Sequence, residues 1–252
     1  MEFAPRMSRF KASPSQIASA RVRDLQAEGR DIIKLTAGEP DFPAPDSAKQ
    51  AVIEVMDRNE IQYTPVNGTL AMRKAVQAKF KRDNDLDYAL DQIAVGSGSK
   101  QVLFNALMAT VSSGDEAIIP GPYWASYPDM VKLAGGTPVF VMAGQNEKFK
   151  MRPEALDAAI TPQTKWLMFC SPGNPTGAAY SWDELRALAD VLLRHPHVHI
   201  LTDDVYEHLL FDEHKFATLA QVEPALFDRT VTCNSVSKAY SMTGFRCGYA
   251  GG

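Results

Sequence analysis

The chain has 252 residues, of which 45% are apolar and 22% charged, and its formal net charge is −4. This ordinary globular composition excludes an intrinsically disordered chain, and the slight acidity gives no electrostatic basis for binding nucleic acid. No apolar run of about 18 residues is present to span a membrane, and the three cysteines form no closely spaced pair, which favours a reducing cytoplasm.

Residues 1–45 are expected to form an N-terminal arm. A helix is predicted near Gln16–Glu28, followed by the apolar run Ile32–Thr36 and a turn rich in glycine and proline around Gly38.

From residue 46 onward, helical and strand-like patterns alternate. The predicted helices are one with an apolar face through Val52, Val55 and Met56, then Gly68–Arg82, a helix through Leu103–Thr110, Tyr127–Leu133, Pro153–Ile160, and one that opens at the capping box Ser181–Glu184. The predicted strands are Ile93–Val95, Ala117–Ile119, Pro138–Met142, Trp166–Cys170, Val198–Leu201 and Thr230–Cys233. This alternation predicts an α/β fold with a mainly parallel sheet and helices on both faces. Ligands of such sheets bind beyond the carboxyl ends of the strands.

The turn Gly96–Ser99 follows the first predicted strand and opens a helix. A helix N-terminus binds anions through its free backbone N–H groups and its dipole. Gln101 replaces the third glycine of a dinucleotide-binding fingerprint, and the lysine of a nucleotide-binding P-loop is absent. Two interpretations stay open, a site for a phosphate monoester and a plain strand-to-helix turn.

Two further loops carry polar side chains directly after an apolar strand. In segment 171–177, two prolines and two glycines hold Asn174 at a strand end, and this rigidity favours a functional role over a simple turn. Asp203 and Asp204 follow the next strand, where carboxylates are costly unless they find a partner. One of them could meet a cationic ring nitrogen, with Tyr206 reaching the same ligand, or it could cap a helix.

A lysine and an arginine follow the last predicted strand. Lys238, flanked by hydroxyl side chains, can be desolvated there, and an uncharged amine is the form that attacks carbonyl groups. Arg246 lies eight residues later and offers a two-pronged donor for a phosphate. A single lysine in such a loop is usually a solvated surface residue. Lys238, however, lies at the same end of the sheet as the other polar loops, which favours a functional site.

Together these segments resemble the class I aminotransferases of fold type I, which use pyridoxal 5'-phosphate (PLP), and within them the bacterial aspartate aminotransferase subgroup. The resemblance covers nearly the whole chain. The matching motifs are Ala37–Phe42, Gln62–Pro65, Pro122–Trp124, Asn174–Gly177, Asp203 with Tyr206, Ser237-Lys238 with Arg246, and Gly248–Ala250.

The resemblance implies a role for each matching residue. Lys238 would form the Schiff base and shuttle the proton, Asp203 would keep the pyridine nitrogen protonated, and Tyr206 with Asn174 would contact the phenolic oxygen of the ring. Trp124 would stack on the ring. The phosphate would be held by Gly98, Ser99, Ser235 and Arg246, and by Tyr63 of a second subunit in a homodimer.

The substrates implied are an amino acid, with aspartate or another acidic one preferred, and a 2-oxo acid. Gly38 and Asn174 would contact the α-carboxylate, Trp124 would line the substrate site, and Lys100 would meet a distal carboxylate. The alternatives are an aromatic or prephenate aminotransferase, a carbon–sulfur lyase of the same fold, or a truncated chain that binds PLP without turnover. No metal is expected, because Pro196 interrupts the alternating histidines 195, 197 and 199 and no other ligand joins them.

The resemblance also implies a domain division. Residues 1–45 would form the arm and part of a small domain, and residues 46–252 the PLP-binding large domain. Family members are expected to be considerably longer. We therefore expect a chain truncated at its C-terminus, with the arginine that grips the substrate α-carboxylate outside residues 1–252.

Overall fold

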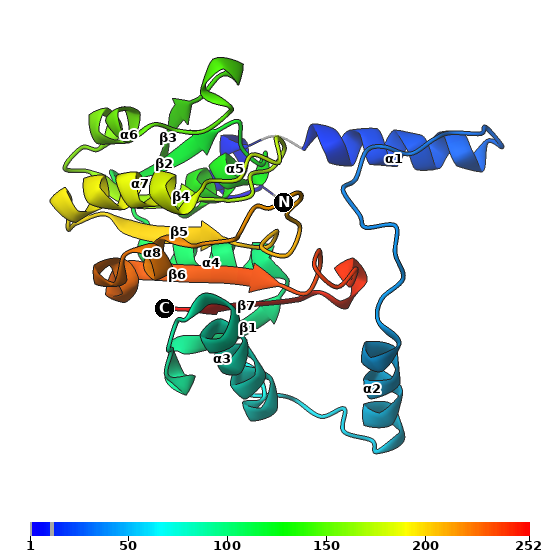
Figure 1. Ribbon diagram of the computed structural model, residues 1–252. Coiled ribbons are helices and arrows are strands. Elements are labelled where there is room, and N and C mark those ends of the chain that lie inside the picture. Colours follow the sequence, from blue (N-terminus) through cyan, green and yellow to red (C-terminus); the bar gives the residue numbers. More distant parts are fainter. Residues whose placement is uncertain (1, 11–12) are drawn as a thin grey trace.

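A seven-stranded sheet forms the centre of the computed structural model, which describes residues 2–10 and 13–252 (Figure 1). The strand order is β1-β7-β6-β5-β4-β2-β3. All neighbouring strands pair in parallel except β7, which runs antiparallel to both β1 and β6. The strands are β1 (Ile93–Ser97), β2 (Glu116–Gly121), β3 (Thr137–Met142), β4 (Thr164–Phe169), β5 (His199–Asp203), β6 (Thr230–Ser235) and β7 (Cys247–Gly251).

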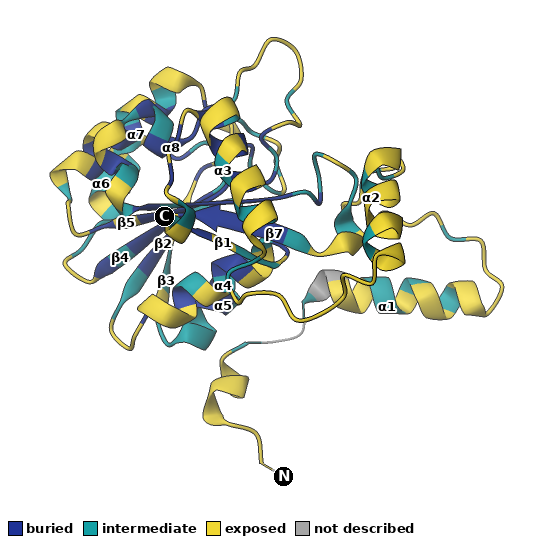
Figure 2. Cartoon of the chain, turned by 90° about the horizontal axis from the view of Figure 1, so that it is seen from below, coloured by how far each residue is buried: buried dark blue, intermediate teal, exposed yellow. Residues whose placement is uncertain are grey.

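Helices connect the strands and cover both faces of the sheet. The α-helices are α1 (Pro14–Ala27), α2 (Asp46–Asp57), α3 (Leu70–Asn84), α4 (Ser99–Thr110), α5 (Ser126–Ala134), α6 (Pro153–Ala159), α7 (Trp182–Arg194) and α8 (Leu219–Val222). Short 3-10 helices span Pro5–Arg9, Leu90–Gln92, Gln145–Glu147, Pro224–Arg229 and Thr243–Phe245. Seen end-on, α3, α6, α7 and α8 lie on one side of the sheet and α4 and α5 on the other (Figure 2).

Alternating residues of the central strands supply a core on each face of the sheet, and a further buried cluster lies around α3. Ile118, Leu167 and Ile200 point toward α7 and α8, where Leu188 is fully buried. Their chain neighbours point the other way, toward α4 and α5. The members of this second core that the strands provide are Ala117, Ile119, Trp166, Met168, Leu201, Cys233 and Ala250. Burial on both faces explains why these strands have continuous apolar sequences.

Helices α1 and α2 project away from this body, whereas the 3-10 helix Pro5–Arg9 packs on α5, where Arg9 donates to the Lys132 carbonyl oxygen at 3.2 Å. No residue of α2 is buried, and Val52, Ile53 and Met56 are exposed apolar side chains on it. Figures 1 and 2 show α1 and α2 separated from the sheet by extended chain. Packing begins in α3, where Val76 and Phe80 are buried.

The mainly parallel α/β architecture predicted from the sequence is confirmed, and the predicted helices and strands all form. The strands β5 and β6 continue two residues further than predicted, because β5 pairs with β6 as far as Asp203 and β6 pairs with β7 as far as Ser235. Among the described residues, no helix combines the length and apolarity needed to cross a membrane.

Candidate active site

A cavity of about 420 Å³ opens at the carboxyl ends of the parallel strands. It brings together most of the residues singled out in the sequence, although their positions span more than 200 residues. The predicted site residues that line it are Gly38, Ser99, Lys100, Trp124, Asn174, Asp203, Tyr206, Ser235, Lys238 and Arg246.

Asp203 ends β5 at the floor of this cavity, and its side chain is buried. Its Oδ2 accepts a hydrogen bond of 2.7 Å from the Tyr127 hydroxyl, whereas its Oδ1 is buried and has no hydrogen-bond partner among residues 2–10 and 13–252. Burial raises the pKa of Asp203 to about 6, although the Tyr127 hydrogen bond and the nearby Lys238 ammonium both act to lower it. The unpartnered oxygen therefore awaits a donor from a ligand, and a cationic N–H would suit it best.

Asn174 and Tyr206 meet on one wall of the cavity. The Asn174 side-chain amide donates a 3.1 Å hydrogen bond to the Tyr206 hydroxyl oxygen. Tyr206 therefore keeps its own O–H free to donate to a ligand oxygen.

Lys238 lies in the loop after β6, with its amine in the cavity. Its Nζ donates a short hydrogen bond to the Gly38 carbonyl oxygen. Desolvation lowers the pKa of Lys238, which the Glu39 carboxylate opposes and the Arg246 guanidinium reinforces. Partial burial thus favours the neutral amine more than water would.

The opposite end of the cavity is built to receive an anion. Helix α4 begins there with Gly98 as its cap residue and no side-chain cap, so its N-terminal N–H groups face an open site. Arg246 reaches the same turn and donates to the Ser97 carbonyl at 3.2 Å. The Ser235 hydroxyl oxygen accepts from the Ser237 backbone N–H at 3.2 Å, which leaves its hydrogen available to a ligand.

Close packing explains why two positions of this anion site are glycines. Gly98 has a φ of +84°, and a Cβ there would lie 2.0 Å from the Arg246 Nη2 atom. A Cβ on Gly248 would lie 2.2 Å from the Gly98 carbonyl carbon, because β7 runs directly behind the turn. Gly98 therefore shapes the anion site from behind rather than lining the cavity.

Lys100 and Trp124 meet at the mouth of the cavity. The Lys100 Nζ lies 4.7 Å from the centroid of the Trp124 ring, in a cation–π contact. Desolvation lowers the pKa of Lys100, and the positive charge of Arg246 lowers it further. Both residues also line an adjoining open groove of about 1300 Å³ between the sheet and the arm.

Tyr63 is the one predicted site residue that lies away from these features. Its side chain is fully exposed, and it lines neither the cavity nor the adjoining groove. The assigned role in a second subunit stays a prediction.

Tyr127 is a site residue that sequence reasoning missed. It was assigned only to the start of a helix, yet it lines the cavity and contacts Asp203. The available signal was its position three residues after Trp124, which places both aromatic rings at one turn of chain, edge to face with centroids 5.4 Å apart.

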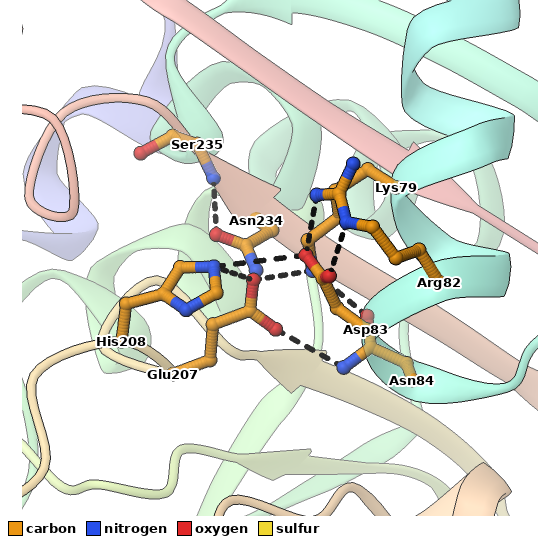
Figure 3. Close-up of polar contacts among 8 residues, drawn as sticks. All are labelled: Lys79, Arg82, Asp83, Asn84, Glu207, His208, Asn234 and Ser235. Atoms are coloured by element: carbon orange, nitrogen blue, oxygen red, sulfur yellow. Dashed lines mark hydrogen bonds and ion pairs between the residues drawn. The ribbon is translucent and has the colours of Figure 1, made fainter.

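The back of the β5 loop is fixed by a buried polar cluster. While Asp203 and Tyr206 line the cavity, Glu207 turns the other way and pairs with Lys79 of α3 (Figure 3). Asn84 also donates to Glu207, at 3.1 Å. Potential metal ligands on Asp83, Glu207 and His208 lie within 4.8 Å of one another. However, Lys79 and Arg82 already neutralise the two carboxylates.

These features fit PLP. A buried carboxylate oxygen without a partner suits a protonated pyridine nitrogen, the Tyr206 hydroxyl suits a phenolic oxygen, and the helix N-terminus with Arg246 suits a phosphate. Lys238 places an amine in the same cavity.

Comparison with known proteins agrees with this geometry. Residues 30–252 match the family model "Aminotransferase class I and II". A probable aspartate/prephenate aminotransferase of Rhizobium leguminosarum is 57% identical over 99% of the chain, and an aspartate/prephenate aminotransferase of Cereibacter sphaeroides is 56% identical over 98%. The chain spans 62% of the length of each of these curated relatives.

Solved structures give the same result. The aspartate aminotransferase of Rhizobium meliloti superposes with a TM-score of 0.96 at 49% identity, over 100% of this chain and 63% of that one. The Thermus thermophilus aspartate aminotransferase with maleate gives 0.95 at 39% identity, over 100% and 65%. The resemblance seen in the sequence is thereby confirmed, and the chain belongs to the class I and II aminotransferases.

Proposed function

We propose that the cavity binds PLP and that the protein is an aminotransferase, which moves an amino group between an acidic amino acid and a 2-oxo acid. The observation that carries this proposal is the unpartnered, buried Oδ1 of Asp203 in one cavity with the Lys238 amine and an uncapped helix N-terminus. When bound, PLP supplies an electron-withdrawing ring that stabilises negative charge at the substrate Cα.

Each site residue of the chain would have a separate role. Asp203 would hold the ring nitrogen in its protonated form through Oδ1, and Tyr206 would donate to the phenolic oxygen. Lys238 would present its amine, favoured in the neutral form by desolvation, and would carry a proton between substrate positions. Trp124 would cover the ring, and Ser99, Ser235 and Arg246 would hold the phosphate with the turn at Gly98.

We further propose that the substrate carries a second carboxylate. Lys100 is a cation that lines both the cavity and its mouth, and it is separate from Arg246, which is assigned to the phosphate. The Thermus thermophilus enzyme was solved with maleate, a dicarboxylate, which supports this assignment. Aspartate is the substrate that we place first.

Prephenate is the second candidate. The relatives from Rhizobium leguminosarum and Cereibacter sphaeroides are named for both aspartate and prephenate. Prephenate is an oxo acid with a second carboxylate, so Lys100 suits it on the same grounds as aspartate.

We also propose that the protein works as a homodimer, with Tyr63 of one subunit reaching the phosphate of the other. Tyr63 is fully exposed, and the apolar side chains of Ile61 and Val66 in the same segment are exposed as well. Sedimentation of the wild-type chain should give a dimer, and Tyr63→Phe should weaken PLP binding while leaving that dimer intact.

We place the protein in the cytoplasm. Its three cysteines are unpaired, as expected of a chain kept in a reducing compartment.

The test combines a PLP titration, followed by the absorbance of the bound cofactor, with amino-transfer assays. Aspartate, glutamate, phenylalanine, prephenate and cystathionine serve as substrates, and Lys238→Ala is the control. PLP bound by the wild type with a spectrum that Lys238→Ala lacks, together with transfer from aspartate, supports the proposal. Binding without turnover would limit the function of this chain to cofactor binding, elimination from cystathionine would indicate a lyase, and absence of binding would refute the proposal.

A further inference from the structure

Tyr127 occupies a buried position between two parts of the cavity. It is the second residue of α5, and its side chain is 4% exposed. Its hydroxyl donates to Asp203 Oδ2 at 2.7 Å, while its ring packs edge-on against Trp124. One side chain therefore touches both the carboxylate at the cavity floor and the tryptophan at its mouth.

We propose that Tyr127 is a positioning residue, whose hydroxyl fixes the Asp203 carboxylate so that Oδ1 points into the cavity in its ionised form. This inference rests on the proposed function, in which Oδ1 pairs with the ring nitrogen of PLP. A carboxylate has two equivalent oxygens, and a bond to one of them selects which oxygen the ligand meets. The neighbouring Cys170 thiol donates to the Pro172 carbonyl oxygen, so Tyr127 is the residue that donates to Oδ2.

The hydrogen bond from Tyr127 acts to lower the pKa of Asp203. A hydroxyl that donates to a carboxylate stabilises the charged form, so its removal raises the pKa of that carboxyl further. The titratable groups near Asp203 come from several elements: Tyr127 on α5, Cys170 after β4, Asp204 and Tyr206 after β5, Cys233 on β6 and Lys238 after it. Of these, Tyr127 and Lys238 act to lower the pKa of Asp203.

The test follows carboxyl resonances of Asp203 by NMR in the full chain without PLP, so it does not depend on the proposed function. Tyr127→Phe should raise the pKa of Asp203 by about one unit or more, as expected for a lost hydrogen bond to a charged group. Tyr88→Phe is the matched control, because it removes an equally buried hydroxyl, bonded to Thr232 at 2.8 Å, from another core cluster. It should leave the Asp203 titration unchanged.

A second measurement uses the unmodified chain, in case Tyr127→Phe fails to fold. The Cζ resonance of Tyr127 should shift with pH at the same midpoint as the Asp203 carboxyl.

A third measurement adds PLP at pH 7.5. Tyr127→Phe should weaken PLP binding roughly tenfold in the wild-type background but not in the Asp203→Asn background.

The outcomes separate the two proposals. An unchanged Asp203 pKa in Tyr127→Phe, or a Tyr127 resonance that ignores the Asp203 titration, overturns the positioning role even if PLP binds normally. Failure of the wild type to bind PLP refutes the proposed function, while the titrations without cofactor still decide the role of Tyr127.

Discussion

Replacing Lys79 with methionine should destabilise the protein strongly, although Lys79 lies outside the cavity. Its side chain is 11% exposed and that of its partner Glu207 only 3%. Lys79 also donates to Asn84 at 2.8 Å, and Asn84 in turn donates to Glu207 (Figure 3). Lys79→Met would remove the lysine ammonium from a buried carboxylate and leave it only Asn84 and the half-exposed His208, whose Nε2 lies 3.1 Å away; such a loss costs about 3–5 kcal/mol. This is a large share of the 5–15 kcal/mol that typically separates folded from unfolded states.

The assay is equilibrium unfolding in urea, followed by circular dichroism. The matched control is Lys81→Met, on the same helix, which removes an exposed ion pair with Asp85 and should leave the midpoint nearly unchanged. The double variant Lys79→Met with Glu207→Leu should recover most of the lost stability, because no unpaired charge remains buried. A loss below about 1 kcal/mol in Lys79→Met, or no recovery in the double variant, would refute this reasoning.

Three other substitutions test separate parts of the structure. Gly98→Ala should lower the free energy of unfolding by about 1–2 kcal/mol, because residue 98 has a positive φ. It should also weaken PLP binding, since the added Cβ would displace Arg246. Unchanged PLP binding would contradict the anion site. Leu188→Ala, on the buried face of α7, should cost about 2–5 kcal/mol in urea unfolding, and a smaller loss would mean that the neighbouring side chains collapse into the space left by the deletion. Burial raises the pKa of Asp204 to about 8, above the unfolded value, so its contribution to stability is complete below pH 4 and is lost as the pH rises toward 8. Asp204→Asn should flatten this fall in urea midpoints measured from pH 5 to pH 9, and parallel curves for the two proteins would show that Asp204 does not titrate there.

The sequence predicted the sheet well because each strand carries a local pattern. Continuous apolar runs such as Trp166–Phe169 mark strands buried on both faces, and the capping box at Ser181 marks the start of α7. The antiparallel insertion of β7 between β1 and β6 was not predicted, because β1 lies far from β7 in sequence and no local pattern specifies that pairing. It is nevertheless β7 that brings Arg246 to the turn at Gly98.

Site residues that belong to a sequence motif could be predicted, whereas those that act only through a contact with another residue could not. Asp203 ends β5, and Asn174 and Lys238 lie in loops after strands, so their meeting at one sheet end followed from the topology. Tyr127 and Glu207 act through contacts with Asp203 and Lys79, which depend on how α5 and α3 pack. Such packing depends on side chains from distant segments, so no local spacing in the sequence specifies it.

The central claim, that the cavity around Lys238 holds PLP, is tested most directly by trapping the cofactor. The chain is incubated with PLP, reduced with borohydride, digested and examined by peptide mass spectrometry. We predict one reduced pyridoxyl phosphate group, on the peptide that contains Lys238, and its loss in Lys238→Ala. An unlabelled Lys238, or label spread evenly over exposed lysines such as Lys81, would contradict the account.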